Sequence, residues 1–284
     1  MIRQKSFENN QPSLYLVATP IGNLNEMSPR AIEILKTVDI IAAEDTRTTM
    51  KLLSHFDIHT HCIAHHMHNE KKSAAGLLNL LQEGKNIALV SDAGYPLLSD
   101  PGQSAVELIT EAGYNVIPVS GSNVMLNGLV ASGLVVMPFY FKGFLSSNST
   151  AAKKECEQLS NMDCTLVFYE APHRITKTLQ IFLEVFGNRK ICLARELTKK
   201  HEEFIRGTIS EVLEITDELK GEMVLILEGK QEEQTQLTES EILNQVNLLI
   251  EQGISSSYAV KQVAKEFNLS KNEVYKLVNQ QNKQ

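Results

Sequence analysis

Residues 86–103 read NIALVSDAGYPLLSDPGQ, an apolar run that passes directly into a polar loop. The loop contains two Ser-Asp pairs, two glycines and two prolines, whereas a simple chain reversal needs only one glycine or an Asn-Gly pair. In open α/β sheets, ligands bind just beyond the carboxyl ends of the strands. The loop is therefore expected to bind a ligand as well as to turn the chain.

The same alternation of apolar strand and helix recurs on both sides of this stretch. LYLVATP precedes SPRAIEILKTV, where Ser28 is suited to cap a helix and Pro29 to occupy its first turn. DIIAAE then returns as a strand, and NVIPVS follows a helix that ends at Gly113. Apolar strands that alternate with helices predict an α/β fold with a largely parallel sheet covered on both faces.

A second series of strands and helices follows the first. Its predicted strands are FYFKGF, TLVFYE, KICLARE, EFIRGTI and MVLILEG, with helices after Thr150 and after His173. The chain is therefore expected to form two α/β lobes, at 14–131 and 132–230. The polar stretch KQEEQTQ separates them from a small helical unit at 237–284.

The unit at 237–284 has the pattern of a helix-turn-helix preceded by a further helix. Thr238 with Glu241, and Ser270 with Glu273, match the capping box of helix N-termini. The lysines of this unit are balanced by glutamates, which disfavours sequence-specific reading of DNA. A packing role or docking onto RNA is the favoured interpretation.

The composition is typical of a soluble globular protein. A hydrophobic content of 43% is sufficient for buried cores, and no apolar run approaches the roughly 20 residues of a membrane helix. The four cysteines form no C-x-x-C pair, and no charged-then-apolar signal segment opens the sequence. We therefore expect a cytoplasmic protein. The net charge of −7 disfavours a general coat on nucleic acid but leaves room for a local basic groove.

Two kinds of ligand site are not expected. The sequence has no G-x-G-x-x-G after the first strand and no G-x-x-x-x-G-K-[ST], which disfavours a dinucleotide site and a Walker-type phosphate site. Six of the eight histidines lie between His55 and His68, but they have no cysteine partners and no H-E-x-x-H pattern. We therefore predict no metal site.

Seven motifs, in order, carry a resemblance: LYLVATPIGNL, AEDTR, HNE, SDAGYPLLSDPG, FYEAPHR, ARELTKKHEE and GEMVLILEG. Together they resemble a bacterial family of small-subunit ribosomal RNA methyltransferases within the tetrapyrrole methylase superfamily. The resemblance runs from about Leu14 to Gly229. It implies two α/β lobes with a cleft between them that holds S-adenosylmethionine. It also implies methylation of a cytidine ribose 2'-oxygen in the decoding region of 16S ribosomal RNA.

The resemblance assigns cofactor contacts to both lobes. In the first lobe they are Pro20, Ser91, Asp92, Ala93, Gly94, Ser120 and Gly121, and in the second they are Tyr169, Glu170, Ala171, Met223 and Val224. Four residues are assigned to the RNA substrate. Arginine is suited to holding phosphate through paired donors, so these are Arg47, Arg174 and Arg195, with Asn69 of the HNE motif.

The ribose hydroxyl must lose its proton, which calls for a carboxylate or an imidazole within hydrogen-bond reach. The sequence offers five candidates and leaves the choice among them open: Glu44, Asp45, His68, Glu70 and Glu170. Met67 stands where the resembled family commonly has a carboxylate. That position is therefore not a candidate acid or base.

Several alternatives remain beside this reading. A related enzyme that methylates a carbon of a porphyrin precursor would have a Gly-x-Gly-Pro-Gly loop and a Gly-Gly-Asp-Pro loop, where this chain has ATPIGN and SDAGYP. A non-catalytic RNA-binding factor of ribosome assembly would have lost the cofactor loops, and a DNA-binding regulator would rely on the helical unit. The resemblance further implies a homodimer.

The expected substrate is either free ribosomal RNA or the assembled 30S subunit. The subunit is favoured, because a single loop nucleotide is best specified by the shape of its surroundings.

Overall fold

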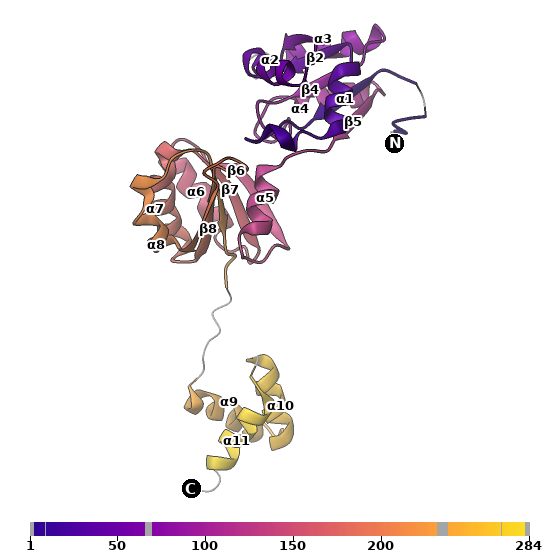
Figure 1. Cartoon of the computed structure of the whole chain (residues 1–284). Helices are drawn as coiled ribbons and strands as arrows, with labels where there is room; N and C mark the ends of the chain where they lie inside the picture. Colours follow the sequence, from indigo (N-terminus) through magenta and orange to yellow (C-terminus); the bar gives the residue numbers. More distant parts are fainter. Residues whose placement is uncertain (1–2, 9, 66–69, 232–237, 268, 282–284) are drawn as a thin grey trace. The chain divides into compact units, whose positions relative to one another are not determined.

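The computed structural model describes residues 3–8, 10–65, 70–231, 238–267 and 269–281 (Figure 1). The chain divides into two compact units, Met1–Lys230 and Gln231–Gln284. The first unit holds two five-stranded sheets, and the second is helical. No helix within the described ranges is long and apolar enough to cross a membrane.

The first sheet is parallel throughout and has the strand order β3-β2-β4-β1-β5. Its strands are β1 (Ser13–Val17), β2 (Ile40–Ala43), β3 (His61–Ala64), β4 (Ile87–Val90) and β5 (Asn115–Val119). Parallel pairing brings the carboxyl ends of all five strands to one edge. The loops predicted to bind a ligand therefore leave the sheet from the same edge.

Helices cover both faces of this sheet, as predicted. On one face are α1 (Pro29–Thr37) and α2 (Thr46–His55), which pack on the core around Val17 and Ile41. On the other are α3 (Glu70–Gln82) and α4 (Gln103–Glu111). The predicted start of α1 is confirmed, because the Ser28 side chain accepts a hydrogen bond from the backbone N–H of Ala31 and Pro29 opens the helix.

The second sheet has the order β6-β7-β10-β8-β9, and only its β6–β7 pair is parallel. The five predicted strands are confirmed as β6 (Phe139–Phe144), β7 (Thr165–Glu170), β8 (Lys190–Arg195), β9 (Glu203–Thr208) and β10 (Met223–Leu227). One face is covered by α6 (Ser149–Leu159), α7 (Ile175–Phe186) and α8 (Ile209–Leu213) around a core that contains Phe168 and Phe182.

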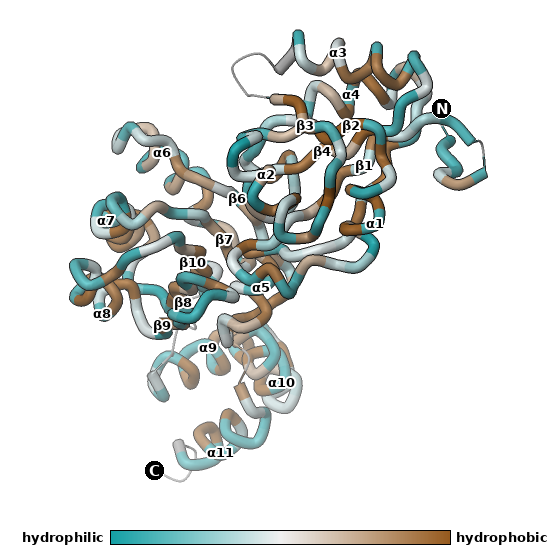
Figure 2. The backbone as a smooth tube through the Cα atoms, turned by 45° about the horizontal axis from the view of Figure 1, so that its top comes forward, coloured by the Kyte–Doolittle hydropathy of each residue, from teal (hydrophilic) through white to brown (hydrophobic). Residues whose placement is uncertain are grey.

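Helix α5 (Val124–Ala131) covers the other face of the second sheet, although the predicted lobe boundary at 131 assigns it to the first lobe. Gly128 allows a close approach, since a Cβ there would lie 3.4 Å from Val224 of β10. Arg206 of β9 holds the end of the helix by donating from Nε to the Ser132 carbonyl oxygen at 3.0 Å. By packing, the second lobe therefore begins at α5. Figure 2 shows α5 in largely brown, hydrophobic tones.

The helical unit consists of α9 (Glu239–Glu251), α10 (Ser256–Glu266) and α11 (Lys271–Gln281) around a small apolar core of its own. The predicted capping box at Thr238 is confirmed, because its side chain and that of Glu241 each bond the other's backbone N–H. The helix-turn-helix prediction corresponds to α10 and α11.

Candidate functional site

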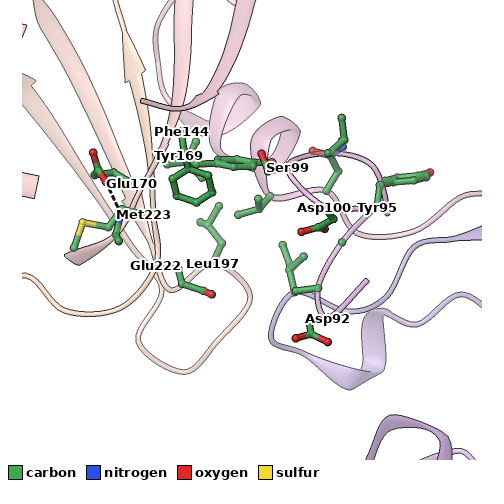
Figure 3. A pocket seen from close by; sticks show the side chains of 18 of the residues that line it. Asp92, Tyr95, Ser99, Asp100, Phe144, Tyr169, Glu170, Leu197, Glu222 and Met223 are labelled. Atoms are coloured by element: carbon green, nitrogen blue, oxygen red, sulfur yellow. Dashed lines mark hydrogen bonds between the residues drawn. The ribbon is translucent and has the colours of Figure 1, made fainter. Parts of the chain in front are cut away.

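A cavity of about 420 Å³ lies between the two sheets, where their loops face each other (Figure 3). From the first lobe it is lined by Ile21, Glu44, Asp92, Ala93, Gly94, Tyr95, Leu98, Ser99, Asp100 and Asn123, and α5 adds Val124. From the second it is lined by Phe144, Tyr169, Glu170, Ala171, Pro172, Glu196, Leu197, Lys199, Glu222, Met223 and Val224. The predicted cleft between two lobes is thus present. Its volume is within the range of about 300–1,000 Å³ that small ligands occupy.

Backbone contacts hold the loop after β4 in place at the floor of this cavity. The Thr19 N–H donates to the Gly94 carbonyl oxygen at 2.9 Å, and the Gly94 N–H donates back to the Thr19 carbonyl oxygen at 3.0 Å. The buried Ser91 hydroxyl donates to the Gly94 carbonyl oxygen at 3.2 Å. Gly94 has φ +77°, a conformation that glycine adopts without strain. Two strand ends are therefore joined directly beneath the cavity.

Backbone strain is concentrated in the two loops that face each other across the cavity. Leu97 and Ser99 of the first lobe have φ of +75° and +74°, and Glu196 and Thr198 of the second have φ of +50° and +67°. Such conformations cost free energy in residues other than glycine and cluster at binding sites. These four residues therefore mark the two loops as candidates for ligand contact.

Three carboxylates, Glu44, Asp92 and Asp100, make the first-lobe side of the cavity acidic. Burial raises the pKa of the Asp100 carboxyl to about 6, and the charge of Glu44 adds to the shift. Burial also raises the pKa of Asp92, to which the charge of Asp45 contributes. Negative charge in a partly desolvated cavity favours a cationic ligand.

The second-lobe side combines aromatic rings with a paired lysine. Burial, aided by the charge of Asp100, raises the pKa of the Tyr169 hydroxyl to about 12, so Tyr169 stays neutral. Its ring meets that of Phe144 edge to face, with centroids 5.4 Å apart. The Lys199 ammonium lies 3.0 Å from Glu196 and 3.4 Å from Glu222. The side of the cavity formed by the second lobe thus presents aromatic rings beside a lysine paired with two glutamates, opposite the three carboxylates of the first lobe.

Not every predicted cofactor residue lines the cavity. Asp92, Ala93, Gly94, Tyr169, Glu170, Ala171, Met223 and Val224 line it, and so does the predicted acid-base candidate Glu44. Pro20 and Ser91 instead line a neighbouring cavity of about 210 Å³ that shares Asp92 with the first. Gly121 packs against Ala18, and the carbonyl oxygen of Ser120 accepts from the Ser28 hydroxyl at 3.0 Å. These last two residues position the strand ends.

Two of the predicted acid-base candidates are engaged in other contacts. Glu170 is 2% exposed, and its carboxylate accepts from the Thr178 hydroxyl at 2.5 Å and from the Ala171 N–H at 2.8 Å. Figure 3 shows this carboxylate turned away from Asp92 and Asp100. Hydrogen bonds from Arg47 lower the pKa of Asp45 to about 2, which makes it a weak proton acceptor. Both geometries disfavour a catalytic role.

The predicted arginines differ in how far they remain available. Arg174 donates to the carbonyl oxygens of Leu145 and Ser146 at 3.0 and 2.9 Å. Arg195 is paired with Glu203 at 2.5 Å. Arg47 contacts Asp45 at 2.9 Å but keeps 88% of its side chain exposed, so it remains open to a phosphate. His68, Asn69 and the side chain of Glu70 lie outside the described residues.

Several residues that line the cavity were not predicted, among them Tyr95, Ser99, Asp100, Glu196, Lys199 and Glu222. The loop after β4 contains a second Ser-Asp pair, Ser99-Asp100, and this pair is the sequence signal that could have identified Asp100. Among the described residues, no three His, Cys, Asp or Glu side chains are grouped as ligands of a metal ion.

Comparisons with known proteins identify the fold family. The family model for Tetrapyrrole (Corrin/Porphyrin) Methylases matches residues 13–213. The crystal structure of a uroporphyrin-III-C-methyltransferase from Thermus thermophilus matches with a TM-score of 0.56 at 17% identity, over 77% of this chain and 94% of that one. A diphthine synthase structure matches with a TM-score of 0.58 at 11% identity, over 76% and 90%. The fold is that of the tetrapyrrole methylases.

Relatives that match over nearly their whole length identify the family within this fold class. The ribosomal RNA small subunit methyltransferase I of Bacillus subtilis (strain 168) is 47% identical over 96% of this chain and 97% of its own length. The protein of the same name from Synechocystis sp. is 44% identical over 93% and 96%. The chain belongs to this family of methyltransferases, and the resemblance stated from its motifs is confirmed.

Proposed function

We propose that this protein is an S-adenosylmethionine-dependent methyltransferase that modifies the ribose 2'-oxygen of a cytidine in the decoding region of 16S ribosomal RNA. Membership in a family named for small-subunit ribosomal RNA supports the RNA substrate. The observation that carries the cofactor is the acidic, half-buried cavity between the lobes. The cytidine and its 2'-oxygen come from the motif resemblance.

The residues that line the cavity fit S-adenosylmethionine, which supplies an electrophilic methyl group on a cationic sulfonium. Asp92 and Asp100 are placed to attract the sulfonium and the ammonium of the methionine portion. Tyr169 and Phe144 offer aromatic surface to the adenine. The backbone of Ala93 and Gly94 provides hydrogen-bonding groups in a fixed arrangement.

The neighbouring cavity of about 210 Å³ is our proposed entrance for the acceptor nucleotide. It is lined by Thr48, by apolar Leu24 and by Lys51, whose hydroxyl, apolar and ammonium groups suit a sugar, a base and a phosphate. Asp92 is common to both cavities. A ribose held there would lie next to the methyl donor, as transfer between two bound substrates requires.

Asp100 is our proposed proton acceptor. A carboxyl with a pKa of about 6 is ionised at neutral pH and is a stronger base than an ordinary aspartate. Of the candidates from the sequence, Glu44 also lines the cavity and raises the pKa of Asp100, so it acts through that residue. For this step the ribose must extend from the smaller cavity past Asp92 into the larger one, which Asp100 lines. The 2'-hydroxyl proton would then pass to Asp100 as the oxygen takes the methyl group from the sulfonium, which leaves as a neutral thioether.

Ribose-methylation mapping by mass spectrometry tests this function. Small ribosomal subunits that lack the modification would be incubated with the protein and S-adenosylmethionine, with free 16S RNA as the comparison substrate. A new methyl on a decoding-region cytidine ribose is the expected product, and we expect the subunit to react faster. Cofactor binding without RNA methylation would contradict the RNA substrate and favour a porphyrin-type acceptor. No cofactor binding would favour a non-catalytic assembly factor.

Asp92→Ala is expected to weaken S-adenosylmethionine binding by about tenfold or more, because one charged partner of the cationic ligand is lost. Isothermal titration gives the affinity, and thermal unfolding shows whether the fold is intact. Asp217→Ala, an exposed carboxylate in η4 (Thr216–Glu218), is the matched control and should bind normally. Normal affinity in Asp92→Ala would show that the cofactor is bound elsewhere.

We also propose that the protein is a homodimer that works in the cytoplasm, where ribosomal subunits are assembled. An exposed apolar patch supports the dimer; it consists of Leu126, Val130, Val135, Val136, Met137 and Tyr140, on α5, the connection after it and β6. Met137 is 70% exposed and Val135 is 68% exposed. Exposed apolar side chains gathered in one part of the sequence are typical of interfaces.

The double substitution Val135→Asp and Met137→Asp is expected to convert the dimer to a monomer, since two charges would enter an apolar interface. Gel filtration with light scattering measures the mass. Met50→Asp, on the exposed surface of α2, is the control and should leave the mass unchanged. A wild-type protein that is monomeric at all concentrations would contradict the dimer itself.

A further inference from the structure

The helical unit has its own core and an unequal distribution of charge. Val246, Val260, Val263 and Val274 are almost completely buried in the core among its three helices. Helix α9 carries three glutamates, Glu239, Glu241 and Glu251, and no lysine or arginine. Helices α10 and α11 together carry four lysines and two glutamates, a net charge of +2 (four minus two). Counted over the whole unit, lysines and glutamates nearly balance, but the negative charge is greater on α9 and the positive charge on α10 and α11.

The exposed side of α11 concentrates residues that bind nucleic acid. Val274 and Val278 are buried. Five of the seven exposed positions between 271 and 280, Lys271, Asn272, Tyr275, Lys276 and Asn279, form the basic and aromatic part of the surface, and the exposed Glu273 and Gln280 flank it. Lys271, Tyr275 and Asn279 follow one another at intervals of four residues and therefore form one stripe along the helix. Asn272 and Lys276 form the adjacent stripe. We name these five residues the α11 face.

The chemistry of the α11 face fits RNA. The two lysines can neutralise phosphates, and the two asparagines can bond to base edges or to 2'-hydroxyls. Tyr275 is 53% exposed between the lysines, where an aromatic ring is available for stacking on an unpaired base. A partner protein would more often be met by a larger apolar surface, and the α11 face has none apart from this ring.

We propose that the α11 face is a second RNA-binding site, by which the helical unit binds small-subunit ribosomal RNA. The proposal rests on the proposed function, because it assumes that ribosomal RNA is the substrate. Its contribution is affinity and placement rather than chemistry, since the cavity that binds the methyl donor lies wholly within residues 1–230. The α11 face therefore affects how tightly the subunit is bound and not how fast the methyl group is transferred.

The test compares two double variants of the full-length protein. In Lys271→Glu with Lys276→Glu, the α11 face loses both positive charges. In Lys261→Glu with Lys265→Glu, the same charge change is made on the neighbouring helix α10. Binding to unmodified small subunits and to free 16S RNA is measured between about 50 and 200 mM salt. Thermal unfolding and S-adenosylmethionine titration show whether each variant is folded.

We expect the α11 variant to bind both RNAs at least about tenfold more weakly, with a salt dependence reduced by about two counterions. Methylation at saturating subunit should remain at the wild-type rate while the KM rises. Tyr275→Ala should weaken binding at every salt concentration, and Tyr258→Ala, at the similarly exposed tyrosine of α10, should not.

Other outcomes would overturn the proposal. Equal losses in the α10 and α11 variants would show general electrostatic attraction rather than a site on α11. Loss of binding to subunits with unchanged binding to free RNA would identify a ribosomal protein as the partner. If the wild-type protein methylates subunits and all variants bind them equally, only this proposal fails. If the wild-type protein neither binds nor methylates RNA, the proposed function fails with it.

Discussion

Asp100→Asn is expected to abolish most methyl transfer while making the protein more stable at pH 8. General-base catalysis contributes about 10²- to 10⁴-fold, and asparagine cannot accept the proton, so a rate loss in that range should follow. Because the wild-type activity requires ionised Asp100, the rate of methyl transfer should rise with pH through about 6. Methylation rates from pH 5 to 8 measure both the loss and the disappearance of this dependence.

The stability effect follows from the same raised pKa. The folded state holds the proton of Asp100 more tightly than the unfolded chain does, so the stability that Asp100 contributes is fully present below pH 4 and is lost as pH rises through about 6. Asparagine cannot ionise, so the variant avoids this loss in the free energy of unfolding. The loss is about 1–2 kcal/mol at pH 8, because Asp100 is partly exposed to solvent. Thermal unfolding should show a gain of a few degrees at pH 8 and almost none at pH 4.

Asp217→Asn is the control for both measurements, because this exposed carboxylate lies outside the cavity. It should change neither the rate nor the stability by a comparable amount. Full activity in Asp100→Asn would remove Asp100 as the proton acceptor. Glu44→Gln would then be the next variant to test, since Glu44 also lines the cavity.

Gly121→Ala is expected to destabilise the first lobe by about 1–3 kcal/mol and to weaken cofactor binding. An alanine Cβ at position 121 would lie 2.9 Å from the Ala18 Cβ and 3.1 Å from the Ala18 carbonyl oxygen. Neither strand end can easily move, because β1 and β5 are paired up to Val17 and Val119. The displacement would reach Asn123, which lines the cavity.

Gly76→Ala provides a matched control with the opposite sign. Gly76 is exposed in α3, and an added Cβ would meet nothing within 4 Å. Alanine there should raise stability by about 0.5–1 kcal/mol through its higher helix propensity. Denaturant unfolding and cofactor titration of both variants test the comparison. Wild-type stability in Gly121→Ala would mean that the two strand ends separate more readily than their packing indicates.

The sequence predicted those elements that leave a strong periodic or capping signal. The buried strands are continuous apolar runs, and the start of α1 has both a serine cap and a proline. Strand β3 and the helices beside it, α2 and α3, were not identified. The reason is physical for β3: it is the edge strand of its sheet, and its first and last residues, His61 and Ala64, are exposed.

The same reasoning explains the site. Residues directly after apolar strands, such as Asp92 and Ala93, fall where the rule for parallel sheets places ligands. Glu222 escapes that rule because it precedes β10, which is antiparallel to both of its neighbours. Asp100 lies ten residues beyond the end of β4 and reaches the cavity through a loop with left-handed residues at Leu97 and Ser99. Sequence periodicity carries no information on such loop geometry.

The strand order of the first sheet also determines when that lobe can fold during synthesis. Strand β1 is made first, yet it pairs only with β4 and β5, so Leu14 must await Ile87 and Val116. Pairing over such long separations is slow, because the intervening chain must be ordered before any contact is gained. The emerging chain therefore has no complete first sheet until Val119 has left the ribosome. Translation pauses before that point would prolong the exposure of an apolar, unpaired strand, and pauses after it would not.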